Sequence, residues 1–322
     1  MDHLSLAATS TSVALAWTET DGGSAGKGYV ALLSADLGVK TILGPLGPAG
    51  LRRARIVPSD GGWTVAYDDV ASKQILIFHV DASGGVTNAA SFTNAFDPLL
   101  VEGPDGSLLA WQGGGTTELY LAVLSPKGAV VTSTVVPSFQ VTEWDFGGGV
   151  FVDGGWLVAQ RGPSGVSYVR FAGGTLSTKS PFGGSTEYPT ITADGGEIRV
   201  TFNEFGGNPA TVRYGRIDSA GNALGPSVAI AKAPAQFNEA PIVSAGGLSW
   251  VLLGGYTGQT GVGQSLDLLT LDAAGNALGA PLPLVREPST RQYRIARRGP
   301  ELVVAWVGGS CGSTVGLLRL LP

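Results

Sequence analysis

Three kinds of residue are scarce in this sequence: cysteine, histidine and charged side chains. Its 322 residues include one cysteine, Cys311, and two histidines, His3 and His79. A single cysteine cannot form a disulfide within the chain, and these three residues cannot supply the four ligands of a structural zinc site. We therefore expect neither a metal nor a cofactor.

Charge is low and lacks a basic cluster. Charged residues make up 14% of the chain, the formal net charge is −5, and no basic run occurs. A protein that binds the phosphate backbone carries a basic patch, so we expect no nucleic-acid partner. No apolar run approaches the roughly 20 residues that a membrane helix requires, so we expect no membrane insertion.

Glycine, in contrast, is abundant, and one glycine-containing segment occurs twice with almost the same residues. The chain has 50 glycines, and "RIDSAGNALG" at residues 216–225 returns as "TLDAAGNALG" at residues 270–279. Related segments, each a short turn between two alternating apolar runs, begin at Leu33, Val80, Leu124 and Arg170. Six copies of one hairpin are predicted, in which Asp or Ser bonds downstream amides and Gly supplies the positive φ. No loop has more than one carboxylate, which does not match the ligand spacing of a calcium loop.

A second hairpin precedes each of these and occurs seven times. Its second strand ends at a large residue, and the copies end at Trp17, Tyr67, Trp111, Gln160, Phe202, Leu253 and Trp306. These end points are 42 to 53 residues apart, which is typical of four-stranded propeller blades. One more short apolar strand precedes each hairpin, and no amphipathic helical segment appears.

The pattern predicts an all-β, seven-bladed β-propeller of four-stranded antiparallel blades, folded as a single domain over residues 1–322. The last blade is expected to be incomplete, because the sequence stops after its third strand. The expected blades cover residues 3–46, 52–94, 96–138, 145–182, 187–233, 238–286 and 291–322.

The order of an "AW" strand, an Asp-x-x-Gly hairpin and "NALG" resembles the propeller repeats of large secreted or surface proteins of high-GC bacteria. The resemblance covers nearly the whole chain, but it is architectural and transfers no catalytic residue. It implies an extracellular or cell-surface location, with any signal peptide outside this sequence, and it leaves a cytoplasmic location open.

No catalytic group stands out in the sequence. His79 lies inside the strand "ILIFHVD", where a structural role is expected, and His3 lies at a terminus that we expect to be mobile. Cys311 has no histidine near it in the sequence, and the glycine-rich stretches lack the following helix of a phosphate loop. The sequence therefore offers no nucleophile–base pair.

Polar and aromatic residues instead gather where the first strand of each blade begins. Arginines mark blades 2 and 7 as Arg52, Arg53, Arg55, Arg291 and Arg294, and carboxylates and aromatics mark blades 3 to 6. The predicted binding residues, at one mouth of a central channel, are Arg53, Arg55, Asp97, Trp144, Asp145, Glu187, Tyr188, Glu239, Tyr293 and Arg294. The alternative is that these residues form ordinary solvated ion pairs at strand ends.

Three functions remain open. The first is a non-catalytic binding module, expected to be monomeric, that holds a glycan, a protein or a small anionic ligand at this mouth. The second is a hydrolase, lyase or cyclase in which Asp97, Asp145, Glu187 or Glu239 acts as acid or base. The third is a rigid scaffold domain.

Overall fold

Every regular element that the structure describes is a β-strand. The computed structural model describes residues 3–20, 26–113, 118–140, 146–162, 165–205, 210–232, 239–254, 265–286, 292–308 and 314–322. The chain divides into two compact units. Unit 1 holds Met1–Gln140, Arg294–Val307 and Gly312–Pro322, and unit 2 holds Val141–Tyr293 and Gly308–Cys311.

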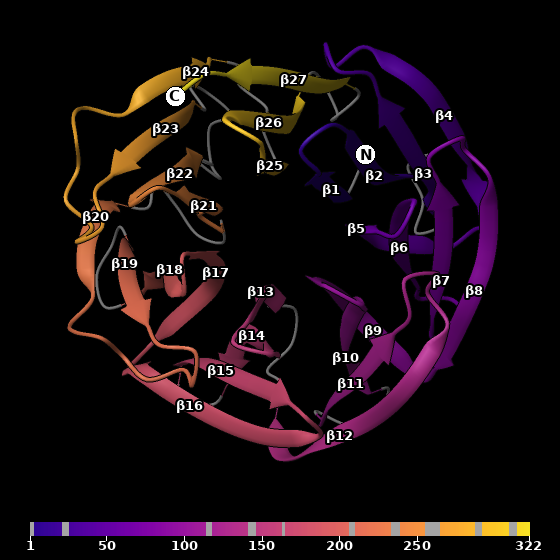
Figure 1. The fold of residues 1–322 in the computed structure, drawn as a ribbon, viewed down its shortest axis with the longest axis horizontal. Helices are drawn as coiled ribbons and strands as arrows, with labels where there is room; N and C mark the ends of the chain where they lie inside the picture. Colours follow the sequence, from indigo (N-terminus) through magenta and orange to yellow (C-terminus); the bar gives the residue numbers. More distant parts are fainter. Residues whose placement is uncertain are drawn as a thin grey trace. The chain divides into compact units, whose positions relative to one another are not determined.

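Unit 1 contains blades 1, 2 and 3 and nearly all of blade 7 (Figure 1). Blade 1 has strands β1 (His3–Ala8), β2 (Val13–Thr20), β3 (Gly26–Leu33) and β4 (Val39–Leu46). Blade 2 has β5 (Leu51–Ser59), β6 (Gly62–Asp69), β7 (Gln74–Asp81) and β8 (Val86–Thr93). Blade 3 has β9 (Ala95–Gly103), β10 (Gly106–Gly113), β11 (Glu118–Leu124) and β12 (Val130–Gln140). Blade 7 has β25 (Gln292–Arg298), β26 (Glu301–Gly308) and β27 (Thr314–Leu320).

Unit 2 contains blades 4, 5 and 6. Blade 4 has β13 (Phe146–Val152), β14 (Gly155–Gly162), β15 (Gly165–Ala172) and β16 (Thr175–Gly183). Blade 5 has β17 (Thr186–Asp194), β18 (Glu197–Glu204), β19 (Thr211–Ile217) and β20 (Val228–Lys232). Blade 6 has β21 (Ile242–Ala245), β22 (Leu248–Gly254), β23 (Leu266–Leu271) and β24 (Leu282–Val285).

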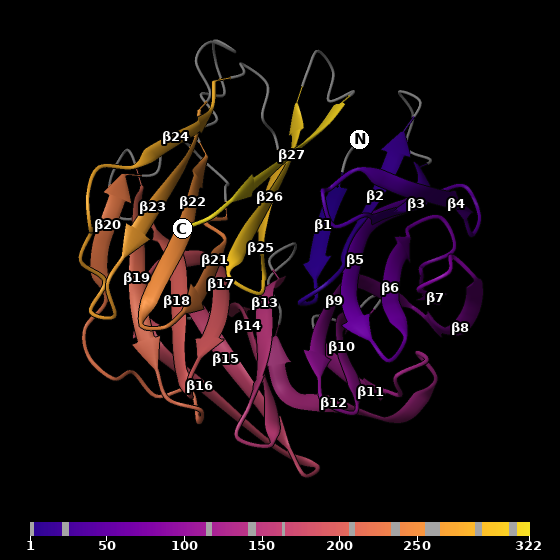
Figure 2. The same ribbon diagram turned by 45° about the horizontal axis from the view of Figure 1, so that its top comes forward.

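Each blade is an antiparallel meander whose strands pair in chain order, as β5 to β8 show in Figure 2. Six sheets have four strands, and the last has three within the described residues. The predicted fold class, a seven-bladed β-propeller with an incomplete last blade, is confirmed.

The apolar strands are buried because neighbouring blades of the same unit pack face to face. In unit 1, Leu15 and Trp17 of blade 1 share a core with Val303 and Ala305 of blade 7, so the first and last blades are neighbours. A second core joins blades 1 and 2, and a third joins blades 2 and 3. In unit 2 separate cores join blade 4 to blade 5 and blade 5 to blade 6. A strand covered on both faces needs apolar side chains on both, as in β6 and β10.

The repeated ten-residue segment forms the same turn in blades 5 and 6. In blade 5 the amide of Gly221 donates to the carbonyl of Asp218, and the Asp218 carboxylate accepts from the amides of Ala220 and Asn222 at 2.9 and 2.8 Å. These bonds lower the pKa of Asp218, whereas its slight burial acts in the opposite direction. Gly221 has φ 85°, so this glycine adopts the positive φ that the sequence predicted for it.

The prediction of six identical hairpins holds for five of them. The turns of blades 1, 2, 3, 5 and 6 share the same backbone hydrogen bonds. In blade 4 the turn has only two residues, Gly173 and Gly174, both with positive φ, because Ala172 pairs directly with Thr175. In blade 1 the left-handed residue is Leu37, with φ 67°, and not the glycine that follows it.

Candidate functional site

Five basic residues of unit 1 lie where the first strands of blades 7, 1 and 2 begin. We call His3, Arg52, Arg53, Arg55 and Arg294 the cationic cluster. His3 lies opposite Thr18 in blade 1, and Arg52 lies opposite Asp68 at the equivalent place in blade 2. The amide of Ile56 donates to Ser5 Oγ at 3.2 Å, which holds β5 against β1. Neighbouring first strands thus bring the basic residues of different blades together.

His3 is an ordered member of this cluster, contrary to the expectation of a mobile terminus. It is half-buried in β1. Burial and, to a smaller extent, the positive charges of Arg53, Arg55, Arg294 and Arg52 together lower its pKa to about 3. The imidazole is therefore neutral at pH 7. Its lowered pKa indicates that the positive potential of four arginines adds up at this residue.

A β-bulge directs Arg53 toward two carboxylates. The β5–β6 register shifts between Arg52 and Ala54, and Arg53 takes φ 22°. Its guanidinium pairs with Asp97 and lies 3.9 Å from Asp68 Oδ2. Asp97 takes φ 56° where the β9–β10 register shifts, at the corresponding place in blade 3. Bulges change the direction of a side chain, so both members of this pair depend on an irregularity in their strand.

The Arg53–Asp97 pair is buried, so this pair differs from the solvated ion pairs of the alternative. The side chains of Arg53, Asp97 and Asp68 are 11%, 8% and 3% exposed, and the Asp97 amide donates to Asp68 Oδ2 at 3.4 Å. Burial raises the pKa of Asp68 to about 6, although Arg53 and Arg52 act to lower it. The prediction assigned arginines to blades 2 and 7 and carboxylates to blades 3 to 6, and it missed that Asp68 of blade 2 and Asp97 of blade 3 both lie beside Arg53.

Sequence reasoning missed His3 and Asp68. A signal for Asp68 was present, because a polar residue follows the large end residue of the second strand in five blades. These residues are Thr18, Asp68, Gln112, Arg161 and Asn203. The charge pattern of the first strands alone could not reveal a residue contributed by the second strand.

The predicted residues of unit 2 form separate contacts. Glu187 pairs with Arg161, and Tyr188 takes φ 54° with its ring centroid 6.2 Å from that of Phe205. Tyr293 is 4% exposed and its hydroxyl donates to the main-chain oxygen of Glu239 at 2.9 Å. Tyr293 is therefore a packing residue of unit 2, although it was predicted to be a binding residue at the channel mouth.

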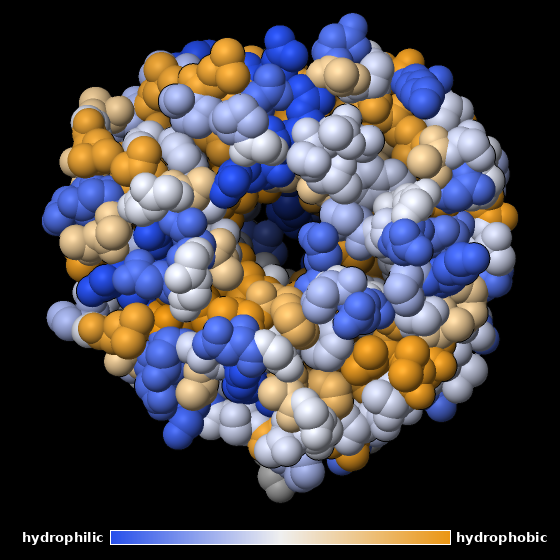
Figure 3. All heavy atoms as spheres, viewed as in Figure 1, coloured by the Kyte–Doolittle hydropathy of each residue, from blue (hydrophilic) through white to orange (hydrophobic). Residues whose placement is uncertain are grey.

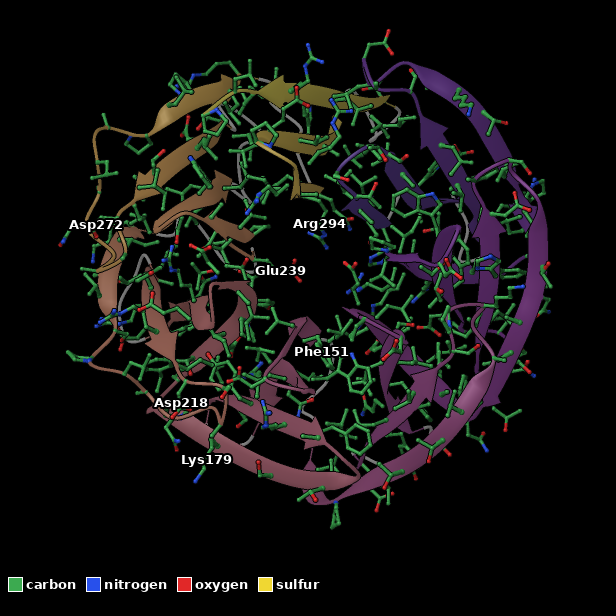
Figure 4. All side chains as sticks on the ribbon, in the orientation of Figure 1. Phe151, Lys179, Asp218, Glu239, Asp272 and Arg294 are labelled. Carbon is green, nitrogen blue, oxygen red and sulfur yellow. The ribbon has the colours of Figure 1, made fainter. Side chains whose placement is uncertain are left out.

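Figure 4 shows the side chains of Glu239 and Arg294 extending beyond the first strands of their own blades. Arg55 and Arg294 are half-buried, so part of each side chain remains exposed to solvent. Trp144 and Asp145 lie outside the described residues, as do Arg291 and Cys311. Among the residues described, no three histidine, cysteine or acidic side chains are grouped to hold a metal ion.

The face of the molecule in Figure 3 carries hydrophilic and apolar side chains in small, interspersed groups. Large exposed apolar residues such as Ile42, Val131 and Leu278 belong to fourth strands and to turns, away from the first strands. Within the described ranges, no helix is long and apolar enough to cross a membrane.

Comparisons with known proteins agree on the fold. No family model matches the chain, and no curated protein sequence matches it. The chain is similar to the β-propeller domain of the Trilobed protease from Pyrococcus furiosus, at 10% identity and a TM-score of 0.58, over 98% of this chain and 94% of that one. It is similar to streptogramin B lyase at 13% identity and a TM-score of 0.59, over 99% of this chain and 93% of the lyase.

It is also similar to an acylaminoacyl peptidase from Pyrococcus horikoshii, at 12% identity and a TM-score of 0.55, over 95% of this chain and 49% of the peptidase. At these identities the likeness concerns the fold alone, and the fold serves many functions. The chain is a seven-bladed β-propeller. Its architecture resembles that of a whole lyase, of the propeller domain of a protease and of about half of a peptidase.

Proposed function

We propose that the protein is a non-catalytic binding module whose cationic cluster holds an acidic group of a glycan, a protein or a small ligand. The observation that carries this proposal is that the positive charges of four arginines, from the first strands of blades 2 and 7, all act on the half-buried His3 of blade 1. Guanidinium groups make bidentate, charge-assisted hydrogen bonds to carboxylates, phosphates and sulfates. Partial burial strengthens such bonds, because water competes less for the anion.

Binding is favoured over catalysis because the carboxylates beside the cluster are enclosed. Asp68 and Asp97 are almost fully buried, so neither carboxylate is placed to exchange protons with a substrate in solution. Catalysis is the second candidate, and the raised pKa of Asp68 favours it, since perturbed acids are common at active sites. An enzyme of this kind would need Asp68 for turnover, whereas a binding module would not.

We further propose that the module works as a monomer at the cell surface or outside the cell. The support is the resemblance of its repeats to those of secreted and surface propeller proteins. Fractionation of the native cells with an antibody against the protein tests the location, and light scattering of the purified protein tests the monomer. Finding the protein wholly in the cytoplasm would contradict the first part.

Calorimetric titration with citrate, glucuronate and sulfated glycans tests the binding function. If one of these anions binds, Arg55→Ala and Arg294→Ala should each weaken its binding by about 1–3 kcal/mol, because each removes a charged hydrogen-bond donor. Arg286→Ala is the matched control, since Arg286 is 61% exposed in its side chain and pairs with Asp267 in unit 2. Equal effects of all three substitutions would contradict the proposed site.

A further inference from the structure

A pocket in unit 2 lies beside the repeated turn and has a volume of about 270 Å³. Its walls come from β19, from the segment that joins β19 to β20, and from the turn of blade 6. They include Tyr214, Arg216, Leu224, Pro226, Val228 and Ala274. The turn of blade 6, labelled at Asp272 in Figure 4, lies beside β20 of blade 5. The cationic cluster lies in unit 1 and shares no residue with this pocket.

The hollow forms because the fourth strand of blade 5 begins late. β20 pairs with β19 only as far as Tyr214, which lies opposite Val228. The amide of Leu224 still donates to the Arg216 carbonyl at 2.9 Å, but Pro226 has no amide hydrogen with which to continue the ladder. The chain between Leu224 and Val228 is therefore separated from β19, and the pocket lies between them.

The second copy of the ten-residue segment contributes the remaining wall. Ala274 holds the position in this copy that Ala220 holds in the first, and each amide donates to the aspartate of its own turn at 2.9 Å. Ala274 lines the pocket because its turn docks on Tyr214. The turn of Ala220 docks on blade 4, whose fourth strand pairs with the third directly from the turn. The pocket thus needs a late fourth strand in one blade and a repeated turn in the next.

Most of the lining is apolar. Leu224 and Val228 remain 47% and 38% exposed beside this hollow. Exposed apolar surface that lines a concave site is typical of ligand binding. The volume is slightly below the roughly 300–1,000 Å³ of sites for drug-sized ligands, so the pocket suits a single ring with a short chain.

Arg216 supplies a charged hydrogen-bond donor to the same pocket. Its Nη1 donates to Glu197 Oε1 at 3.3 Å, and among the described residues its guanidinium makes no other hydrogen bond or ion pair. Glu197 also lies 3.4 Å from Nη2 of Arg199, which faces Asp194 as well. The Arg216 side chain is 35% exposed, so its remaining N–H groups are open to a ligand. A carboxylate accepts two such bonds at once, and these are stronger than bonds to a neutral acceptor.

We propose that this pocket binds a small carboxylate that carries an apolar group about the size of one ring. The apolar group packs against Leu224, Val228 and Ala274, and the carboxylate accepts hydrogen bonds from Arg216. This second site is independent of the proposed function at the cationic cluster, so either can fail without the other.

Three probes separate the two parts of this recognition. The compound 3-phenylpropionate has both groups, 3-phenylpropionamide keeps its shape without the charge, and propionate keeps the charge without the ring. Ligand-observed NMR titrations should show 3-phenylpropionate binding roughly tenfold or more tightly than either of the others. Equal affinities for the acid and the amide would overturn the inference.

A matched pair of variants locates the site. Ala274 and Ala220 are both exposed and hold equivalent turn positions, so a leucine at either should leave the fold intact. Ala274→Leu should weaken 3-phenylpropionate binding roughly tenfold or more, because the larger side chain takes up part of the pocket. Ala220→Leu should bind as the wild type. Equal affinities of the two variants would overturn the inference, even if the acid binds elsewhere on the protein.

Arg216→Gln tests the carboxylate contact. This variant should lose the preference for the acid over the amide and keep the wild-type affinity for the amide, which also shows that the pocket is still formed. A preference that persists in Arg216→Gln would contradict the proposal.

A free acid and the C-terminal residue of a peptide both carry these two groups, and N-acetylphenylalanine distinguishes them. Binding as tight as that of 3-phenylpropionate, and equally sensitive to Ala274→Leu, would support the proposal with a peptide C-terminus as ligand. Exclusion of N-acetylphenylalanine while 3-phenylpropionate binds would support it with a free acid as ligand. If neither compound binds, the inference is wrong.

Discussion

Arg53 and Asp97 show how single residues at irregular positions build the candidate site. Both take positive φ values, which residues other than glycine rarely adopt, and both lie where the register of a first strand shifts. Backbone strain of this kind persists when the surroundings stabilise it, and here the two side chains form a buried ion pair. The conformation of each residue is thus linked to the charge of the other.

Removing one partner of this pair should destabilise the protein. Asp97→Ala leaves the guanidinium of Arg53 with the more distant Asp68, and breaking a buried pair from one side costs about 3–5 kcal/mol. Urea denaturation at neutral pH measures the change. The exposed Asp60→Ala control should remain within about 0.5 kcal/mol of the wild type. A loss below about 1 kcal/mol for Asp97→Ala would show that the pair contributes little.

Asp68 should make stability depend on pH. Its pKa is raised from 3.8 to about 6 on folding, so the folded state binds a proton that the unfolded state has already released. Its contribution is therefore most favourable below the unfolded pKa and is lost as pH rises through the folded value. Relative to the wild type, Asp68→Asn should gain stability between about pH 4 and 7. Urea titrations at both pH values measure this, and a constant difference would contradict the assigned pKa.

At the scale of elements, the repeated turn reverses the direction of the chain and also packs against the preceding blade. Gly275 in blade 6 has φ 90°, and a Cβ there would lie 2.5 Å from the ring of Tyr214 in blade 5. The Tyr214 hydroxyl donates to the Ala273 carbonyl of the same turn at 3.3 Å. Asp218 and Lys179 lie near each other in Figure 4, where the equivalent turn of blade 5 meets blade 4. Both copies therefore dock on the preceding blade.

Gly275→Ala should consequently be more damaging than the same substitution at a turn without a neighbour. Gly246, in the β21–β22 turn of the same blade, has φ 58° and open space where a Cβ would be. Gly275→Ala should cost about 1–3 kcal/mol more than Gly246→Ala, because it adds overpacking to the strain that both share. Thermal unfolding of the two variants measures the difference, and equal losses would contradict docking of the turn.

Local residue pattern was sufficient to predict the strands and turns, and its failures have packing causes. Leu37 takes the left-handed position that glycine fills in the four other turns of this type, and it packs against the core that blades 1 and 7 share. Blade 7 has three strands in the described residues, so Leu37 meets a neighbour that differs from those of the other turns. The sequence around Leu37 does not show this core, because its members from blade 7 lie at the other end of the chain.

At the scale of the whole molecule, the repeat determined how much of the site could be predicted. Equal spacing of the second strands places the first strands of successive blades in equivalent positions, so Arg53, Arg55 and Arg294 were identified from spacing alone. Bulges and burial are properties of packed blades, so the ion pair between Arg53 and Asp97 and the burial of Asp68 and Tyr293 were not predictable. The packing of blade 7 on blade 1 then brings Arg294 near His3, although the two residues lie at opposite ends of the sequence.

The central claim is that this cluster binds an anion, and anomalous diffraction from a crystal soaked in selenate tests it most directly. Selenate has the shape and charge of sulfate, and selenium can be located without ambiguity. We predict a selenium peak beside His3 that contacts at least two guanidinium groups of Arg52, Arg53, Arg55 and Arg294. Well-occupied selenate elsewhere on the protein, with none at this cluster while it is free of lattice contacts, would contradict the account.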